Sequence, residues 1–178
     1  MTKNGSAAKK TALLAALTAL SLITYIIENQ FPPMFVPGAR MGLANAFSFA
    51  ALIMFSPLEG FAVVVVRTAL GAMFAGNLSQ LLYSFTGGMV SMAVSSALMY
   101  ALYPKISVMA VSICSAAVHN ITQNLVFVLI TDTPLTASYM PYLIILGCVS
   151  GAVVGGVILL VFKKIPENVF MKAIGKNR

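Results

Sequence analysis

Long apolar stretches separated by short polar or proline-containing segments dominate the chain. The predicted spans cover residues 11–29, 42–55, 57–76, 79–102, 107–131 and 139–162. A helix rises about 1.5 Å per residue, so about 20 apolar residues cross the hydrocarbon core of a bilayer. The second stretch is short by this measure. We expect an all-α integral membrane protein, a single membrane domain over residues 1–178 with six transmembrane helices in one bundle.

Residues that begin or end helices mark the turns between these stretches. Ser56 can cap a helix, Pro57 suits the first helical position, and Glu59 completes a capping box, so we expect a turn before the third span. The segment from residue 30 to 41 contains three prolines and cannot be regular helix. We expect it to be the one extended connection in the chain.

The basic residues predict the orientation of the bundle. Lys and Arg number 11 against 4 Asp and Glu, and most of them fall at the chain ends and in the connection after the fourth span. Six spans place these segments on one side of the membrane, and cytoplasmic segments are rich in Lys and Arg. We therefore expect a multi-pass membrane protein with both termini cytoplasmic. Topology explains the positive charge without nucleic-acid binding.

Polar side chains within the spans gather in the half expected to face outward, where their burial is costly and usually functional. His119 and Gln123 are four residues apart, as are Asn120 and Asn124, so we expect these four to share one face of a helix. Arg67 lies near the middle of the third span. The candidate substrate-binding residues are Arg40, Asn45, Arg67, Asn77, Gln80, Tyr83, His119, Asn120, Gln123 and Asn124.

Two interpretations of these polar residues stay open. The amide-rich face could hydrogen-bond neighbouring helices, or it could line a ligand pocket. Arg67 could be held by Glu28, Glu59 or Asp132 or by backbone carbonyls, or it could bind an anionic group of a ligand. We favour the pocket, because four adjacent polar side chains lie at a similar membrane depth to Arg67. This number of polar groups is larger than contacts between helices usually need.

Small residues recur at a spacing of four in the first and last spans, which is typical of close helix contacts. For Gly147, Gly151 and Gly155 we expect packing within the bundle. The alanines of the first span could instead form a docking surface for another membrane protein. They are Ala12, Ala15, Ala16 and Ala19.

Catalysis by this chain is not expected. One His and four dispersed acidic residues form no metal-binding cluster, and no phosphate-binding loop of the G-x-x-x-x-G-K-[ST] type occurs. We expect a non-enzyme that holds no metal and no cofactor. Any ATP-driven work must then come from a partner.

Several segments resemble one family. The residues at 36–45, 56–60, 67–71, 83–88 and 117–123 are similar to the Gx transporter family, also labelled heptaprenyl diphosphate synthase component I. A looser similarity extends to the S components of energy-coupling factor (ECF) transporters, which are small six-helix proteins that bind micronutrients.

The S-component resemblance implies a substrate pocket on the extracytoplasmic side, closed by the proline-rich loop that carries Arg40. It also implies that a transmembrane T subunit contacts the alanines of the first helix, and that two ATPase subunits power uptake of a small, anionic or amphipathic micronutrient or cofactor precursor.

The synthase label implies a different function, that of a non-catalytic membrane partner of a polyprenyl diphosphate synthase. Asp132 is the one aspartate of the chain, whereas prenyl-chain synthesis needs several carboxylates to hold Mg²⁺. A third alternative is an autonomous secondary carrier that uses Glu28 and His119, although inverted repeats and paired broken helices are not evident.

Overall fold

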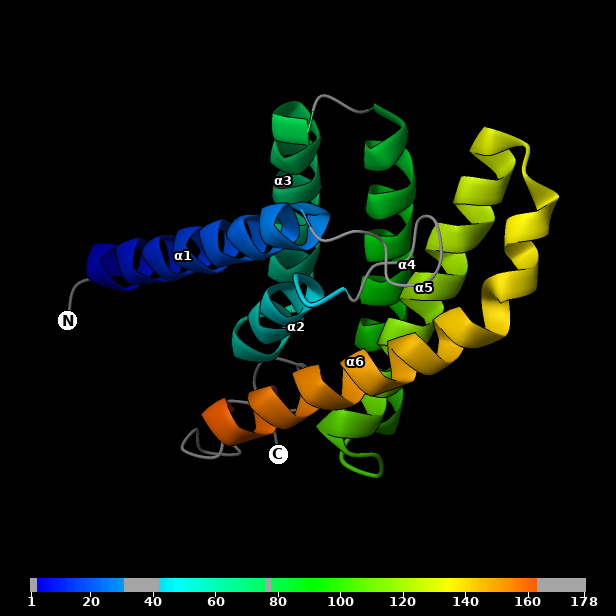
Figure 1. Ribbon diagram of the computed structural model, residues 1–178. Coiled ribbons are helices and arrows are strands. Elements are labelled where there is room, and N and C mark those ends of the chain that lie inside the picture. Colours follow the sequence, from blue (N-terminus) through cyan, green and yellow to red (C-terminus); the bar gives the residue numbers. More distant parts are fainter. Residues whose placement is uncertain (1–2, 31–41, 76–77, 163–178) are drawn as a thin grey trace.

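The computed structural model describes residues 3–30, 42–75 and 78–162, and these residues are entirely helical or in short turns. The elements in chain order are α1 (Lys3–Gln30), α2 (Asn45–Met54), α3 (Pro57–Ala75), α4 (Leu78–Leu102), α5 (Val108–Thr131), the 3₁₀ helix η1 (Pro134–Tyr139) and α6 (Met140–Phe162) (Figure 1). Within these residues, five helical segments are long and apolar enough to cross a membrane. The expectation of an all-α membrane protein is confirmed.

The second expected span differs from the prediction. Helix α2 has ten residues, which gives a length of about 15 Å, half of the roughly 30 Å hydrocarbon core. The chain reaches it through a turn at Gly42, whose φ of 70° is left-handed, and leaves it at Phe55, just before Pro57 starts α3. Helix α2 packs on α1, α3, α4 and α6 and is buried within the bundle.

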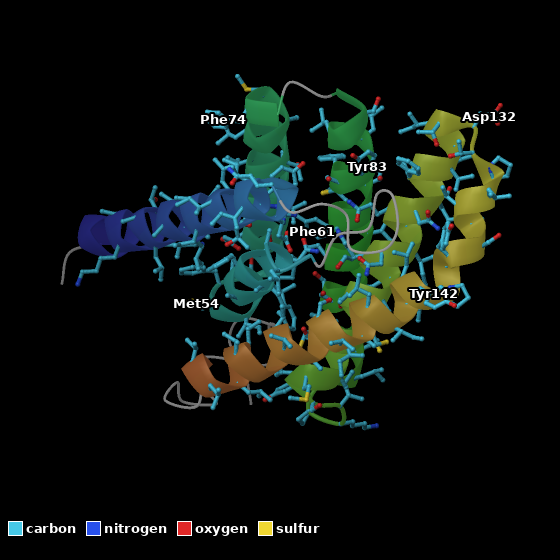
Figure 2. The ribbon with its side chains drawn as sticks, in the orientation of Figure 1. Met54, Phe61, Phe74, Tyr83, Asp132 and Tyr142 are labelled. Atoms are coloured by element: carbon cyan, nitrogen blue, oxygen red, sulfur yellow. The ribbon has the colours of Figure 1, made fainter. Side chains whose placement is uncertain are left out.

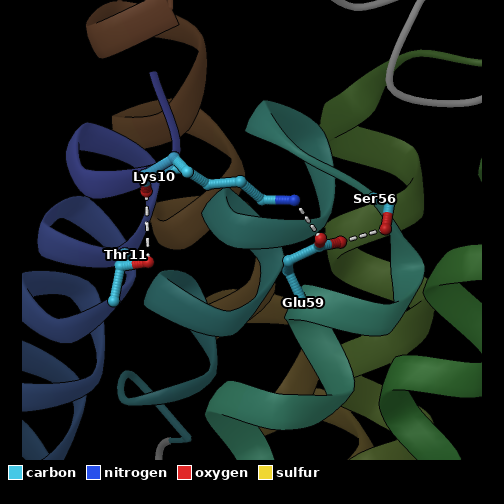
Figure 3. A network of polar contacts seen from close by, with 5 residues as sticks. Lys10, Thr11, Ser56 and Glu59 are labelled. Atoms are coloured by element: carbon cyan, nitrogen blue, oxygen red, sulfur yellow. Dashed lines mark hydrogen bonds and ion pairs between the residues drawn. The ribbon is translucent and has the colours of Figure 1, made fainter. Parts of the chain in front are cut away.

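The turn before α3 confirms the predicted start of that helix. Pro57 is its first residue, and the backbone N–H of Gly60 donates to the carbonyl of Ser56 at 3.2 Å. The Ser56 hydroxyl donates to the Glu59 carboxylate, which also forms an ion pair with Lys10 of α1 (Figure 3). Glu59 therefore ties the beginning of α1 to the beginning of α3.

The apolar core is formed by residues of α2, α3, α4, α5 and α6. Its buried members are Phe49, Leu52, Ile53, Val64, Met92, Met99, Val108, Val111, Val154 and Ile158. Helix α1 crosses the outside of α3 in Figure 1 and is the least enclosed of the long helices, because only a narrow face around Ser21 and Tyr25 is buried. The short helix α2 therefore contributes to the core of the bundle, whereas α1 lies at its edge.

Glycines bring α6 close to α5, as the spacing of small residues predicted. A Cβ atom at Gly151 would lie 2.7 Å from the Cα atom of Ile113, and one at Gly147 or Gly155 would lie 2.9 Å from the backbone of α5. Gly156 is on the same helix but differs, because its nearest neighbour would be a flexible methionine end at 3.9 Å.

This contrast predicts opposite effects of the same substitution at two neighbouring glycines. Gly151→Ala should lower the free energy of unfolding by about 1–3 kcal/mol, because the added methyl group overlaps the backbone of α5. Gly156→Ala should leave it unchanged or raise it by up to about 1 kcal/mol, since alanine favours helix over glycine. Thermal unfolding in detergent, followed by circular dichroism, measures both. Equal effects of the two substitutions would contradict this packing.

Candidate functional site

A small polar cavity lies among α1, α3, α4, α5 and the turn that leads into α2. About 10 Å³ of it is open to the centre of a water molecule, which is room for about one water. We call it the arginine cavity. The residues that line it are Tyr25, Glu28, Gly42, Asn45, Arg67, Ser84, His119 and Gln123.

Arg67 is the central cation of this cavity and is 3% exposed, midway along α3. One of its terminal nitrogens, Nη2, donates to Oδ1 of Asn45 at 2.9 Å. The guanidinium carbon lies 6.0 Å from the centre of the Tyr25 ring, within the range of a cation–π interaction. A Cβ atom at Gly88 would lie 3.3 Å from the same nitrogen, so the glycine leaves space for the guanidinium.

Helix α5 contributes two buried side chains to the cavity, His119 and Gln123. Gly87 allows the imidazole of His119 to approach α4, because a Cβ atom there would lie 3.2 Å from two ring atoms. The Nε2 amide of Gln123 has no hydrogen-bond partner among the described residues. A buried donor without a partner costs about 1–3 kcal/mol. A bound polar group would therefore be stabilised at this position.

Glu28 places a carboxylate in the same cavity. Its Oε1 atom accepts a hydrogen bond from the backbone N–H of Leu43 at 2.8 Å, in the turn before α2. Negative charge is favoured near the N-terminus of a helix, where backbone N–H groups lack helical partners. The cavity thus combines a guanidinium and a carboxylate with the start of a helix.

The polar residues predicted on α5 do not form a single wall. His119 and Gln123 line the arginine cavity, whereas the Asn120 amide donates to the carbonyl of Leu143 on α6 at 3.0 Å. The Asn124 amide donates to the carbonyl of Thr136 in η1 at 3.3 Å. Adjacent helical positions differ by about 100° around the axis, so the two pairs face different neighbours. The interpretation as helix contacts therefore holds for Asn120 and Asn124, whereas His119 and Gln123 line a cavity.

The other predicted site residues lie outside the cavity lining or outside the described residues. The ring of Tyr83 meets that of Phe127 edge-on, with 6.0 Å between centroids, and Figure 2 shows Tyr83 on α4. Arg40 and Asn77 lie outside the described residues, as does the side chain of Gln80. Of the carboxylates considered for Arg67, Glu59 instead pairs with Lys10, and Asp132 is exposed beyond the end of α5 (Figure 2).

Tyr25, Gly42 and Ser84 line the cavity although they were not among the predicted binding residues. The Tyr25 hydroxyl donates to Oγ of Ser84 at 3.4 Å. A sequence signal for Tyr25 exists, since it lies four residues after Ser21 and three before Glu28 on one face of an apolar helix. The approach of its ring to α3 requires Gly71, where a Cβ atom would lie 2.4 Å from a ring carbon.

One known family matches most of this sequence. The family described as heptaprenyl diphosphate synthase component I matches residues 17–161, a range that contains every residue lining the arginine cavity. No curated protein and no solved structure matches the chain. The looser similarity to ECF S components stays a prediction. Because the match covers most of the chain and several helices are long enough to cross a membrane, the protein is a multi-pass membrane protein that belongs to the heptaprenyl diphosphate synthase component I family.

Proposed function

We propose that the protein is a substrate-binding membrane subunit, which captures a small micronutrient or cofactor precursor outside the cell for uptake by an ATP-driven ECF-type complex. The observation that carries this proposal is the arginine cavity, where buried Arg67 lies with Nε2 of Gln123, an atom without a hydrogen-bond partner among the described residues. Ionisable groups inside membrane proteins usually mark substrate or ion sites.

The side chains of the cavity suggest the chemistry of the ligand. Arg67 would bind a carboxylate or phosphate oxygen, while His119, Asn45 and Gln123 would supply further hydrogen bonds. The described cavity has room for about one water molecule, whereas ligand pockets usually measure about 300–1,000 Å³. Binding therefore requires movement of the elements around the cavity.

The proposed partners are a transmembrane T subunit and two ATPase subunits. The alanines of α1 support a docking surface there, because Ala12, Ala15, Ala16 and Ala19 are all exposed rather than packed on another helix of the bundle. Lys10 and Lys105 lie toward the same end of the bundle, and the positive-inside rule makes that end cytoplasmic in the proposed orientation. The proposed location is the bacterial cell membrane.

In this proposal the subunit is not an enzyme. The chain has four acidic residues and one histidine, and among the described residues no group of three or more metal-binding side chains occurs. Binding and delivery are the roles that the cavity supports, and the energy for transport comes from the ATPase subunits.

The family description favours a second candidate function, that of a non-catalytic membrane partner of a heptaprenyl diphosphate synthase. Such a partner would associate stably with a soluble, aspartate-rich prenyltransferase. A third candidate, an autonomous carrier, draws on Glu28 and His119, which both line the arginine cavity. It requires uptake in vesicles that contain this chain alone.

Removal of the buried cation tests the proposed binding site. We expect protein purified from native membranes to retain a small molecule, measurable by mass spectrometry after heat release. Arg67→Gln should lower the retained amount about 10- to 100-fold, because a charge-assisted hydrogen bond contributes about 1.5–3 kcal/mol. Lys105→Gln removes an exposed cation in the turn between α4 and α5 and should change nothing. Equal retention by both variants would place the ligand elsewhere.

Bulky residues on α1 test the proposed partners. Replacement of Ala12 and Ala16 by leucine should abolish co-purification of a T subunit and ATPases in mild detergent, because docked helices approach closely only across small side chains. Ala97→Leu is the matched control, as Ala97 is an exposed alanine on α4. Recovery of a prenyltransferase in place of these subunits, from the unsubstituted protein, would favour the synthase partner instead.

A further inference from the structure

A second cavity adjoins the arginine cavity on the side toward the turn between α4 and α5. About 30 Å³ of it is open to the centre of a water molecule, which is room for two or three waters at about 10–15 Å³ each. Five buried serines line it and place several hydroxyl groups inside the bundle. They are Ser91, Ser95, Ser112, Ser115 and Ser150, and we call this space the serine chamber.

The hydrogen bonds of these serines make the chamber rich in acceptors. The Ser95 hydroxyl lies 2.6 Å from Oγ of Ser115 and 3.0 Å from the carbonyl of Ser91. Ser115 donates to a carbonyl of its own helix at 2.7 Å, and Ser150 does the same at 3.1 Å. The hydroxyl protons of Ser95, Ser115 and Ser150 are thus directed at protein oxygen. The lone pairs of the serine oxygens remain able to accept further hydrogen bonds.

The rest of the lining disfavours anions. Phe49, Met92 and Val154 supply apolar surface, and none of the described residues around the chamber is charged. An anion placed here would lose its hydration with no cation to compensate, which is costly in a low-dielectric interior. A hydroxyl, amine or amide group would instead find acceptors. The chamber therefore suits a hydrogen-bond donor.

The two cavities share part of their walls. Gly42 and Asn45 line both of them, and Asn45 accepts the hydrogen bond from Arg67. Gly88 lines the chamber as well, and its Cβ position is 3.3 Å from the guanidinium of Arg67. A ligand that displaced the Asn45 side chain would therefore contact the arginine and the serines together.

We propose that the serine chamber is the second half of the binding site. It takes a hydrogen-bond-donating amine, amide or hydroxyl end of a ligand whose acidic end binds Arg67. The substrate class is then a small molecule with an acidic end, a hydrogen-bond-donating end and a short apolar centre. This inference rests on the proposed function, because it assumes that the arginine cavity binds a ligand.

Cysteine labelling with reagents of different charge tests whether the arginine cavity and the serine chamber form two halves of one binding site with different charge preferences. Cys114 and Cys148 are first replaced by alanine, and Ser95→Cys or Gln123→Cys is introduced into the full chain in lipid nanodiscs. Each variant is treated with two methanethiosulfonate reagents, one carrying a 2-aminoethyl group and one a 2-sulfonatoethyl group. The rate constant for labelling of the cysteine is divided by the rate constant of the same reagent with 2-mercaptoethanol, which corrects for the intrinsic reactivity of the reagent. Ser96→Cys is the matched control, since Ser96 is the next residue on α4 and lines neither cavity.

We expect the ratio of ammonium to sulfonate rates at Ser95→Cys to exceed that at Gln123→Cys about tenfold or more, because the chamber has no cation to compensate a sulfonate. Both variants should react faster than Ser96→Cys. If Ser95→Cys does not fold, Ser91→Cys in the same chamber replaces it.

Equal ratios at the two positions would overturn the proposal, as would a folded Ser95→Cys that reacts no faster than Ser96→Cys. If only Gln123→Cys reacts, the result contradicts the serine chamber as part of the binding site but agrees with the proposed function. Absence of reaction at both positions contradicts the arginine cavity as a ligand site, and with it the proposed function.

Discussion

The placement of one guanidinium inside an apolar bundle constrains much of this structure. Arg67 needs polar partners at mid-depth, and it finds Asn45 at 2.9 Å and the face of Tyr25 at 6.0 Å. These two partners come from the first two helices, so the arginine holds α1 and α2 against α3. Gly71 and Gly88 leave room for these groups, because a Cβ atom would lie 2.4 Å from the tyrosine ring at Gly71 and 3.3 Å from the guanidinium at Gly88.

The cavity around this arginine and the serine chamber beyond it differ in electrostatic character. The first contains a carboxylate and a guanidinium, whereas the described lining of the second has serine hydroxyl groups, the Asn45 amide and apolar side chains, and none of these is charged. A single molecule that filled both would need an acidic end and a hydrogen-bond-donating end. The two spaces together would therefore select by the arrangement of groups along a ligand as well as by its charge.

Sequence predicted the helices well because their ends are set by local chemistry. Pro57 begins α3 as expected, and the Ser107 hydroxyl caps α5 by accepting from the N–H of Ala110 at 3.1 Å. The length of α2 was overestimated, since apolar residues near Gly42 fit a spanning helix and a buried turn equally well. The glycines of α6 were predicted to pack inside the bundle, and their spacing of four was enough for that conclusion.

The site was predictable only in part, for a geometric reason. Spacing along one helix identified His119 and Gln123 but could not separate them from Asn120 and Asn124, whose partners lie on another helix. Glu28 was considered only as an ion-pair partner or proton carrier, because its position beside the start of α2 depends on tertiary packing. Contacts between helices are long-range, and a pattern along the chain does not contain them.

The shortness of α2 has an electrical consequence. Its first residue, Asn45, contacts Arg67 midway along α3, so the turn before α2 lies at that depth rather than at an end of the bundle. A membrane potential does work of about 2.3 kcal/mol per elementary charge per 100 mV across the full bilayer. A charged molecule that reached this level from either side would cross part of that potential. Its occupancy of the cavity would then depend on voltage as well as on concentration.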